Sequence, residues 1–442
     1  MYRINYTGRS LLMATVTNFR LPEIIRMSDS KLFSELNLPN GAVIKNRICK
    51  AAMEENMAEY GQLPGRKLQT LYKQWAEGGA GLILSGNVMI APDALTGAGG
   101  VVLQDDDDLD RFRHWASAGT ANGAHCWLQL SHPGRQVYAN LEEQALSPSD
   151  VALDLGSFSK MFAQPRALRV DEIEEIIQRF VNSAQLAEQA GFTGVQIHAA
   201  HGYLISQFLS PLVNQRTDEW GGSLDNRARI LFETVKRVRA AVAPEFCLSV
   251  KLNSADFQKG GFDEDDAKWV VSQLNDLGLD LIELSGGSYE SPAMQGNPSE
   301  TSTGAREAYF IGFAREIAAV ASVPIMVTGG IVRRQVAQDA LEPDGGLPAV
   351  DMLGIATALA YHPNLPNHWL ANQALTVHLP KVTWKNRTLS ALANMALTKY
   401  QLERLSSGKP CKPKASAILA IARDRIKVMR QVKRYRKWRD QS

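Results

Sequence analysis

Two imidazoles and a phenol follow a short run of apolar residues in the middle of the chain. His198, His201 and Tyr203 come directly after the segment 194–197, GVQI. Such a run predicts a buried parallel strand whose carboxyl end opens into a loop. Two nearby imidazoles can each donate a hydrogen bond to one oxygen atom, and a phenol beside them can supply a proton. The pattern therefore predicts a site that polarises a carbonyl group.

The HxxH spacing of His198 and His201 has two other interpretations. It could hold a metal ion, but a catalytic zinc site needs a third protein ligand, and the nearby sequence offers no obvious carboxylate. The two residues could also be satisfied core histidines, although two of them with Tyr203 at one strand end exceed what packing requires. We expect a substrate-binding role and no metal.

The elements that would position these residues repeat along the chain. Between about residues 42 and 375, short apolar runs alternate with amphipathic segments, a pattern typical of βα units. The helices expected between the strands include 171–190, 225–242, 263–277 and 306–320. The predicted strands are 48–53, 81–89, 126–131, 194–199, 247–253, 280–285, 324–329 and 351–356. Eight such strands predict a (β/α)8 TIM barrel.

An open, doubly wound sheet also alternates strands and helices. Its GxGxxG loop is missing, because the first expected strand is followed by the sequence AAME at 51–54. Polar or glycine residues recur instead at strand carboxyl ends, where a barrel builds its site. These strand-end residues are Gln129, His198, Lys251, Ser285 and Gly329. The barrel is therefore the favoured architecture.

The chain is expected to have three parts. Residues 1–31 form a lead-in, residues 32–375 form the barrel, and residues 376–442 form a C-terminal helical extension. Within the barrel, the connection 131–169 is long enough to predict a cover over the site. In the sequence, His132 and Arg135 lie on this connection, where water-exposed charge is expected.

The C-terminal extension is basic, with many lysines and arginines between residues 404 and 439. Its apolar residues are spaced so that they could line one face of a helix. They are Ile418, Ile421, Val428, Met429, Val432 and Tyr435. This face is expected to pack on the barrel or on a partner subunit, and contact with an anionic surface is the alternative.

Composition sets limits on partners and location. The 442 residues are 45% hydrophobic and carry a net charge of +2, which gives no overall case for nucleic-acid binding. The four cysteines are dispersed, and no apolar run has the length of a membrane span or a signal peptide. We expect a soluble cytoplasmic protein with a small-molecule substrate and a possible homo-oligomeric state.

Several separated motifs between residues 42 and 370 resemble the old yellow enzyme family of FMN-dependent reductases. HAAHGY at 198–203 resembles the family's His/His or His/Asn pair, NRICKAAM at 46–53 its first strand, and WAEGGAGLILSGN at 75–87 its second strand. The resemblance implies FMN as cofactor and NADH or NADPH as co-substrate. It also implies reduction of α,β-unsaturated carbonyl or nitro compounds, by hydride transfer from flavin N5.

The resemblance also implies roles for particular residues. His198 and His201 would hold the substrate oxygen, while Tyr203 would protonate the α-carbon. Gln129 would bond the flavin pyrimidine, and the alternative is that it caps backbone groups at the strand end. Lys251 would stabilise the reduced flavin, and the alternative is a structural salt bridge. The remaining cofactor-binding residues would be Ala51, Ala52, Met53 and Gly86 at the ring system, Ser285 at a strand end, and Gly329, Gly330, Ala356 and Thr357 at the phosphate.

Two positions depart from the family pattern. Glu54 stands where the family more often has Thr, Ser or Cys, and a carboxylate there would disfavour an anionic reduced flavin unless it points away or is neutralised. Ala356 and Thr357 stand where the family often has Gly-Arg, so that hydroxyl and amide groups, or another base such as Arg333, would have to bind the phosphate.

Two alternative functions remain open. One is an oxidoreductase similar to dienoyl-CoA reductases or N-demethylases, although the cysteine cluster and second nucleotide-binding region of those larger relatives are not visible. The other is a catalytically impaired barrel that binds flavin or a partner. The substrate, which the loops 131–169 and 289–304 would select, and the choice of nicotinamide are not predicted.

Overall fold

The computed structural model describes residues 30–291, 310–373 and 375–441. Nearly all of the expected lead-in, residues 292–304 of the expected loop and the start of the helix expected at 306 lie outside the described residues. The division of the chain at residue 375 remains a prediction.

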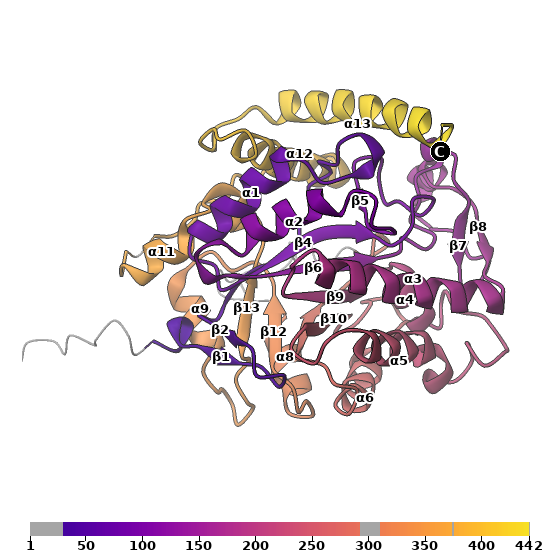
Figure 1. Ribbon diagram of the computed structural model, residues 1–442, viewed down its shortest axis with the longest axis horizontal. Helices are drawn as coiled ribbons and strands as arrows, with labels where there is room; N and C mark the ends of the chain where they lie inside the picture. Colours follow the sequence, from indigo (N-terminus) through magenta and orange to yellow (C-terminus); the bar gives the residue numbers. More distant parts are fainter. Residues whose placement is uncertain (1–29, 292–309, 374, 442) are drawn as a thin grey trace, which may run out of the picture.

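Eight parallel strands form a closed barrel, as predicted (Figure 1). Each strand pairs with the next in the chain, and the last returns to the first through the pairing of Leu353 with Ile48. A short ninth strand, β5 (Val101–Val102), lies beside β4. The barrel strands are β3 (Ile48–Lys50), β4 (Leu82–Met89), β6 (His125–Ser131), β9 (Gly194–Ala199), β10 (Cys247–Asn253), β11 (Leu281–Ser285), β12 (Ile325–Thr328) and β13 (Met352–Ile355).

Helices surround the barrel, and some begin at side-chain caps. Ser223 accepts a hydrogen bond from the amide of Asn226 at the start of α5, and Asp263 does the same for Asp266 at the start of α6. The helices of the barrel region are α1 (Arg66–Glu77), α2 (Leu109–Gly119), α3 (Val170–Gln189), α4 (Leu204–Leu209), α5 (Leu224–Ala241), α6 (Glu264–Leu274), α8 (Ile311–Ala318), α9 (Arg334–Ala340), α10 (Thr357–Tyr361) and α11 (Leu365–Leu370).

The two-residue period of the strands separates an apolar outer shell from a polar interior. In β9, Val195 and Ile197 belong to the main hydrophobic core, while Gln196 bonds to side chains of neighbouring strands. At the amino ends of the strands, the interior of the barrel is apolar. The hairpin of β1 (Leu36–Asn37) and β2 (Val43–Ile44) closes this end. The polar side chains therefore gather toward the carboxyl ends of the strands.

A buried charged network lies beside the first strand. The Lys50 ammonium is fully buried, 3.2 Å from Glu55 Oε1 and 2.8 Å from the Leu84 carbonyl oxygen. The Tyr72 hydroxyl donates to the same carboxylate at 2.7 Å, and the ammonium lies 4.2 Å from the ring centre of Trp75. Burial lowers the pKa of Lys50, and the Glu55 charge opposes that effect. This network anchors the segment that leaves the barrel after β3.

The connection 131–169 is an ordered cover with its own elements, η4 (Ala139–Leu141), β7 (Ala145–Ser147), η5 (Gly156–Met161) and β8 (Pro165–Ala167). The expectation of exposed charge here was wrong, because His132 and Arg135 are only 3% and 4% exposed. Arg135 forms an ion pair with Glu290 at 2.6 Å, and Glu290 also accepts from the amide of Asp154 at 2.8 Å. These contacts hold the cover against the loop after β11.

The C-terminal extension forms two helices, α12 (Arg387–Leu405) and α13 (Ala417–Arg439), which lie along one side of the barrel (Figure 1). The expected packing on the barrel is confirmed for Tyr435, whose hydroxyl bonds to the Pro92 carbonyl at 2.9 Å and to Glu143 at 2.8 Å. Ile418 and Met429 are exposed and do not pack on the barrel, so their contact with a partner subunit or an anionic surface stays a prediction. No helix among the described residues is long and apolar enough to cross a membrane.

Candidate active site

The predicted trio lies together at the carboxyl end of β9. The ring centres of His198 and His201 are 5.2 Å apart, and those of His198 and Tyr203 are 4.8 Å apart. His198 is the last inward-facing residue of the strand, and the other two lie on the turn that follows. The site residues that the sequence singled out are therefore close enough to act on one ligand.

His201 occupies an unusual backbone conformation. Its φ of 61° lies in the left-handed region, which non-glycine residues rarely adopt. The turn is fixed from both sides, because the His201 amide donates to Asn253 Oδ1 at 3.1 Å and its carbonyl oxygen accepts from Gln136 Nε2 at 3.2 Å. The imidazole then reaches Ser285, with Nε2 2.8 Å from the hydroxyl oxygen. This left-handed turn sets the direction of the second imidazole.

Hydrogen bonds assign the proton of His198. Its Nδ1 accepts from the Ala200 amide at 3.2 Å, so a neutral ring carries its proton on Nε2. Burial holds the pKa of His198 well below its usual range, and the charges of His201 and Lys251 act in the same direction. Burial and Lys251 lower the pKa of His201 in the same way. Both rings are neutral hydrogen-bond donors near neutral pH.

Two further tyrosines surround the phenol of Tyr203. The hydroxyl oxygens of Tyr203 and Tyr289 are 3.2 Å apart, and Tyr138 of the cover stacks on Phe162 with ring centres 4.8 Å apart. Burial raises the pKa of both Tyr203 and Tyr289, so both phenols remain protonated. The sequence analysis missed Tyr289 as a site residue, although its place shortly after β11 was a signal.

A buried carboxylate organises the interior below the histidines. Glu283 is 0% exposed and accepts from Lys251 Nζ at 2.7 Å, Thr328 Oγ1 at 2.6 Å and Gln196 Nε2 at 2.9 Å. Gln129 joins this network by donating to Gln196 Oε1 at 2.7 Å. The sequence analysis missed Glu283. Leu281 and Ser285 occupy inward positions of the strand LIELS at 281–285, and the acid midway between them was a signal in the sequence.

The interior network contains polar side chains with hydrogen-bonding groups to spare. Lys251 uses one hydrogen bond for Glu283, and an ammonium has three N–H groups to donate. Gln129 uses an N–H group for Gln196, and its carbonyl oxygen forms no hydrogen bond with any described residue. A flavin pyrimidine presents both acceptors and donors along one edge. The residues that the structure brings together therefore fit FMN.

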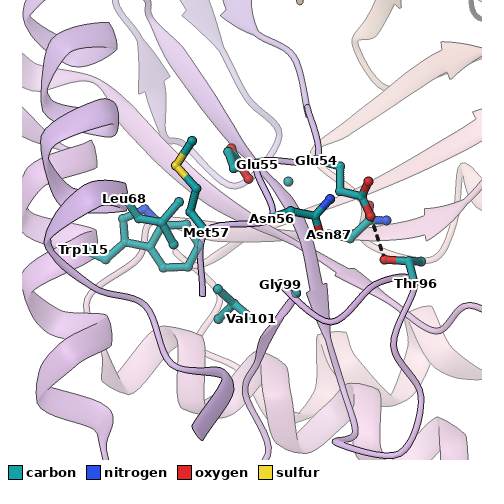
Figure 2. Close-up of a pocket in the computed structure, with 12 residues that line it drawn as sticks. Glu54, Glu55, Asn56, Met57, Leu68, Asn87, Thr96, Gly99, Val101 and Trp115 are labelled. Atoms are coloured by element: carbon teal, nitrogen blue, oxygen red, sulfur yellow. Dashed lines mark hydrogen bonds between the residues drawn. The ribbon is translucent and has the colours of Figure 1, made fainter. Parts of the chain in front are cut away.

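Gly86 is required by the protein itself. A Cβ atom there would lie 2.2 Å from Glu55 Oε2 and 2.3 Å from the Met53 carbonyl oxygen. Glycine at this position of β4 therefore permits the close approach of the segment after β3, in which Ala51, Ala52 and Met53 lie. A cavity of about 10 Å³ beside it has room for one water molecule (Figure 2).

The structure accounts for the carboxylate of Glu54. Thr96 donates its hydroxyl proton to Glu54 Oε1 at 2.9 Å (Figure 2), and Lys399 Nζ of α12 lies 3.8 Å from Oε2. A residue of the C-terminal extension thus compensates the negative charge. The neutralising cation is far away in the sequence, which is why the sequence analysis could not identify it.

The residues expected at the phosphate lie at the ends of two neighbouring strands. Gly329 and Gly330 follow β12, while Ala356 and Thr357 follow β13, and these strands pair through Thr328 and Gly354. Among the described residues, the amides of Gly329 and Gly330 donate no backbone hydrogen bond. Amides that have no acceptor among the described residues, at this end of a barrel, fit a phosphate group.

Within the described ranges, no group of three or more His, Cys, Asp or Glu side chains could hold a metal ion. All four cysteines are free, and Cys49, Cys126 and Cys247 are buried. Burial is the largest cause of a raised pKa in each of these three thiols, which makes them poor ligands and nucleophiles.

The family model that describes the NADH:flavin oxidoreductase / NADH oxidase family matches residues 31–373. An NADH-dependent flavin oxidoreductase of Hypocrea jecorina is 34% identical over 374 residues, covering 78% of this chain and 92% of that protein. One from Neonectria is 36% identical over 395 residues, covering 83% of this chain. This chain spans 50% of the length of the Neonectria protein.

Solved structures agree with this relationship. The old yellow enzyme homologue from Zymomonas mobilis superimposes with a TM-score of 0.66 at 28% identity. The superposition covers 78% of this chain and 94% of that structure. The similarity therefore extends over nearly the whole of a related barrel.

Replacing Glu283 with Gln is expected to destabilise the protein by about 3–5 kcal/mol, because the Lys251 ammonium would remain buried without its carboxylate. Urea unfolding followed by tryptophan fluorescence measures this loss. The control is Glu233→Gln, which removes partly exposed ion pairs with Lys236 and Arg237 and should cost less than about 1 kcal/mol. Equal losses in the two variants would show that Glu283 does not organise the interior.

His132 should make the protein acid-sensitive. Burial lowers its pKa from the usual 6.5 to about 3, so between these values the unfolded chain binds a proton that the folded chain excludes. Stability from this group is complete above pH 6.5 and falls by about 1.4 kcal/mol per pH unit below it. The free energy of unfolding is measured at about pH 7 and at about pH 5. Its decrease between these pH values should be about 2 kcal/mol smaller in His132→Asn than in the wild type. The control substitution is His114→Asn, at an exposed position.

Proposed function

The chain belongs to the NADH:flavin oxidoreductase / NADH oxidase family, and we propose that it reduces carbon–carbon double bonds activated by a carbonyl or nitro group. Its cofactor is FMN, and NADH or NADPH is the co-substrate. When bound, FMN supplies the hydride chemistry. The observation that carries the proposal is the cluster of His198, His201 and Tyr203 at the end of β9.

The two imidazoles hold the oxygen atom of the substrate. His198 offers the N–H group of Nε2. We assign the proton of the neutral His201 ring to Nδ1, which makes it the second donor and leaves Nε2 to accept from the Ser285 hydroxyl at 2.8 Å. Two preorganised donors in a buried site stabilise negative charge that develops on the oxygen, and this polarises the double bond toward its β-carbon.

Tyr203 supplies the proton that completes the reduction. Its phenol is protonated, because burial raises its pKa. As the O–H bond breaks and the α-carbon takes the proton, the neighbouring Tyr289 hydroxyl can donate a hydrogen bond to the phenolate across 3.2 Å. Solvent then restores the proton. This arrangement requires no charged acid in the site.

Lys251, Gln129 and the strand-end residues hold the cofactor in this proposal. Lys251 supports negative charge on the pyrimidine of the reduced ring system, and Gln129 bonds the same edge. Ser285 lies beside them and orients His201. The backbone of Ala51, Ala52 and Met53 would lie against the ring near Gly86. The phosphate would be bound by Gly329, Gly330, Ala356 and Thr357.

Changing both His198 and His201 to Ala should lower kcat/KM for 2-cyclohexenone by about 10³-fold, because both oxygen donors are lost. Steady-state rates are compared in protein that still shows the visible absorbance of bound flavin. A fully active double variant with bound flavin would disprove the substrate clamp.

Within the same experiment, Tyr203→Phe should slow alkene reduction by about 10²-fold while flavin reduction by NADH continues, since only the proton donor is lost. Tyr138→Phe is the matched control and should leave the rate near that of the wild type. A larger defect in Tyr289→Phe than in Tyr203→Phe would assign the proton to Tyr289 instead.

Lys399→Met should lower the midpoint potential of the bound flavin, because the carboxylate of Glu54 would lose its compensating cation while electrons are added nearby. A change of about 1.4 kcal/mol corresponds to about 30 mV for two electrons. Glu54→Gln should raise the potential by a similar amount, and the double variant should lie near the wild type. Lys427→Met, which breaks a pair with Glu403 in the same helical extension, is the control for spectroelectrochemistry. An unchanged potential in Lys399→Met and Glu54→Gln would show that Glu54 does not act on the flavin.

A further inference from the structure

The outer face of α13 carries apolar side chains that nothing in the described structure covers. Ile418 is 70% exposed, Met429 64%, Leu419 62% and Ile426 45%. Ala422, between them on the helix, is also exposed. Exposed apolar residues are ordinary when they are scattered, but here they share one helix and one face.

The other exposed positions of this face are cationic. With about 3.6 residues per turn, they fall with the apolar residues in an arc of roughly 160°. These cations are Arg423, Arg425, Arg430, Lys433 and Lys437. The one acid of α13, Asp424, lies outside the arc. Among the described residues, none of the five cations forms an ion pair with a carboxylate. We call these apolar and cationic residues together the outer face.

The opposite side of α13 is fixed to the barrel region. Gln431 Nε2 donates to the Asn56 carbonyl at 2.8 Å, and Arg434 donates to the Ala58 carbonyl. Tyr435 is buried against the cover and the loop after β4. The outer face is therefore presented by a helix that is already ordered, so a partner need not offset the entropy of folding it.

The chemistry of the outer face selects one kind of partner. A second copy would bring five cations against five more, which repel one another. A nucleic acid would use the cations but would give the apolar side chains no partner. An anionic bilayer satisfies both, because headgroup phosphates attract the cations and the boundary of the acyl chains accepts the aliphatic side chains.

We propose that the outer face of α13 binds the surface of an anionic phospholipid bilayer. The helix lies in the plane of the interface with Ile418, Leu419 and Met429 inserted among the headgroups. Lys433 and Lys437 contact lipid phosphates, and their aliphatic stems lie beside the apolar residues. This binding uses no residue of the candidate active site and does not depend on the proposed reaction.

Cosedimentation of the full-length flavoprotein with vesicles tests the proposal. Binding to phosphatidylcholine vesicles that contain about one third phosphatidylserine should be roughly tenfold or more stronger than binding to pure phosphatidylcholine, and it should weaken as salt is added. Binding that is equal for the two compositions, or absent from both, would overturn the proposal.

Paired variants separate the two contributions. Ile418→Ser with Met429→Ser, and Lys433→Glu with Lys437→Glu, should each reduce binding to anionic vesicles by roughly tenfold. The matched controls are Leu370→Ser with Val320→Ser, and Lys67→Glu with Lys160→Glu, which change exposed residues elsewhere and should bind normally. Circular dichroism and flavin absorbance confirm that each variant is folded.

The two alternative partners, a second copy of the chain and a nucleic acid, would give different results. Light scattering that shows a dimer in the wild type and a monomer in the Ile418→Ser, Met429→Ser variant would assign the face to a second copy. Retention of a nucleic acid that the Lys433→Glu, Lys437→Glu variant releases, without vesicle binding, would assign it to a polyanion. Either result would replace the bilayer as the partner.

Discussion

The burial of one carboxylate, Glu283, constrains the interior of this barrel. A charge without access to water is tolerated only when donors surround it, so the neighbouring strands must present an ammonium, a hydroxyl and an amide at the matching height. The strand register places the ammonium, because Lys251 of β10 lies directly opposite Glu283 of β11. Gln196 in turn accepts a hydrogen bond from Gln129, which extends the network to β6. The polar floor of the site is therefore a consequence of strand pairing.

Much of the fold and part of the site could be predicted from the sequence. Eight apolar runs, polar or glycine residues at their carboxyl ends and the missing GxGxxG loop together predicted the barrel rather than a doubly wound sheet. His198, His201 and Tyr203 were identifiable because residues at the end of one strand remain neighbours after folding. The contact of Tyr203 with Tyr289 was not, because it joins two loops whose paths depend on the whole structure.

The failures have a common physical origin. His132 and Arg135 are polar residues on a long connection, and the connection folds back so that Glu290 satisfies Arg135 away from water. Glu54 is neutralised by Lys399 from the extension. In both cases the partner is remote in the chain, and one-dimensional patterns carry no information about it. Ile418 and Met429 show the opposite limit: helical periodicity identifies an apolar position, but it does not reveal whether the barrel or another surface covers that position.

The order in which the chain is synthesised adds a last point. The segment after β3 is made before most of the barrel, yet the carbonyl groups of Asn56 and Ala58 accept their hydrogen bonds from Gln431 and Arg434 of α13. The ribosome must add 375 residues after Asn56, and 376 after Ala58, before those bonds can form. The wall of the small cavity at Asn56 therefore reaches its final structure only after all eight strands of the barrel have been made.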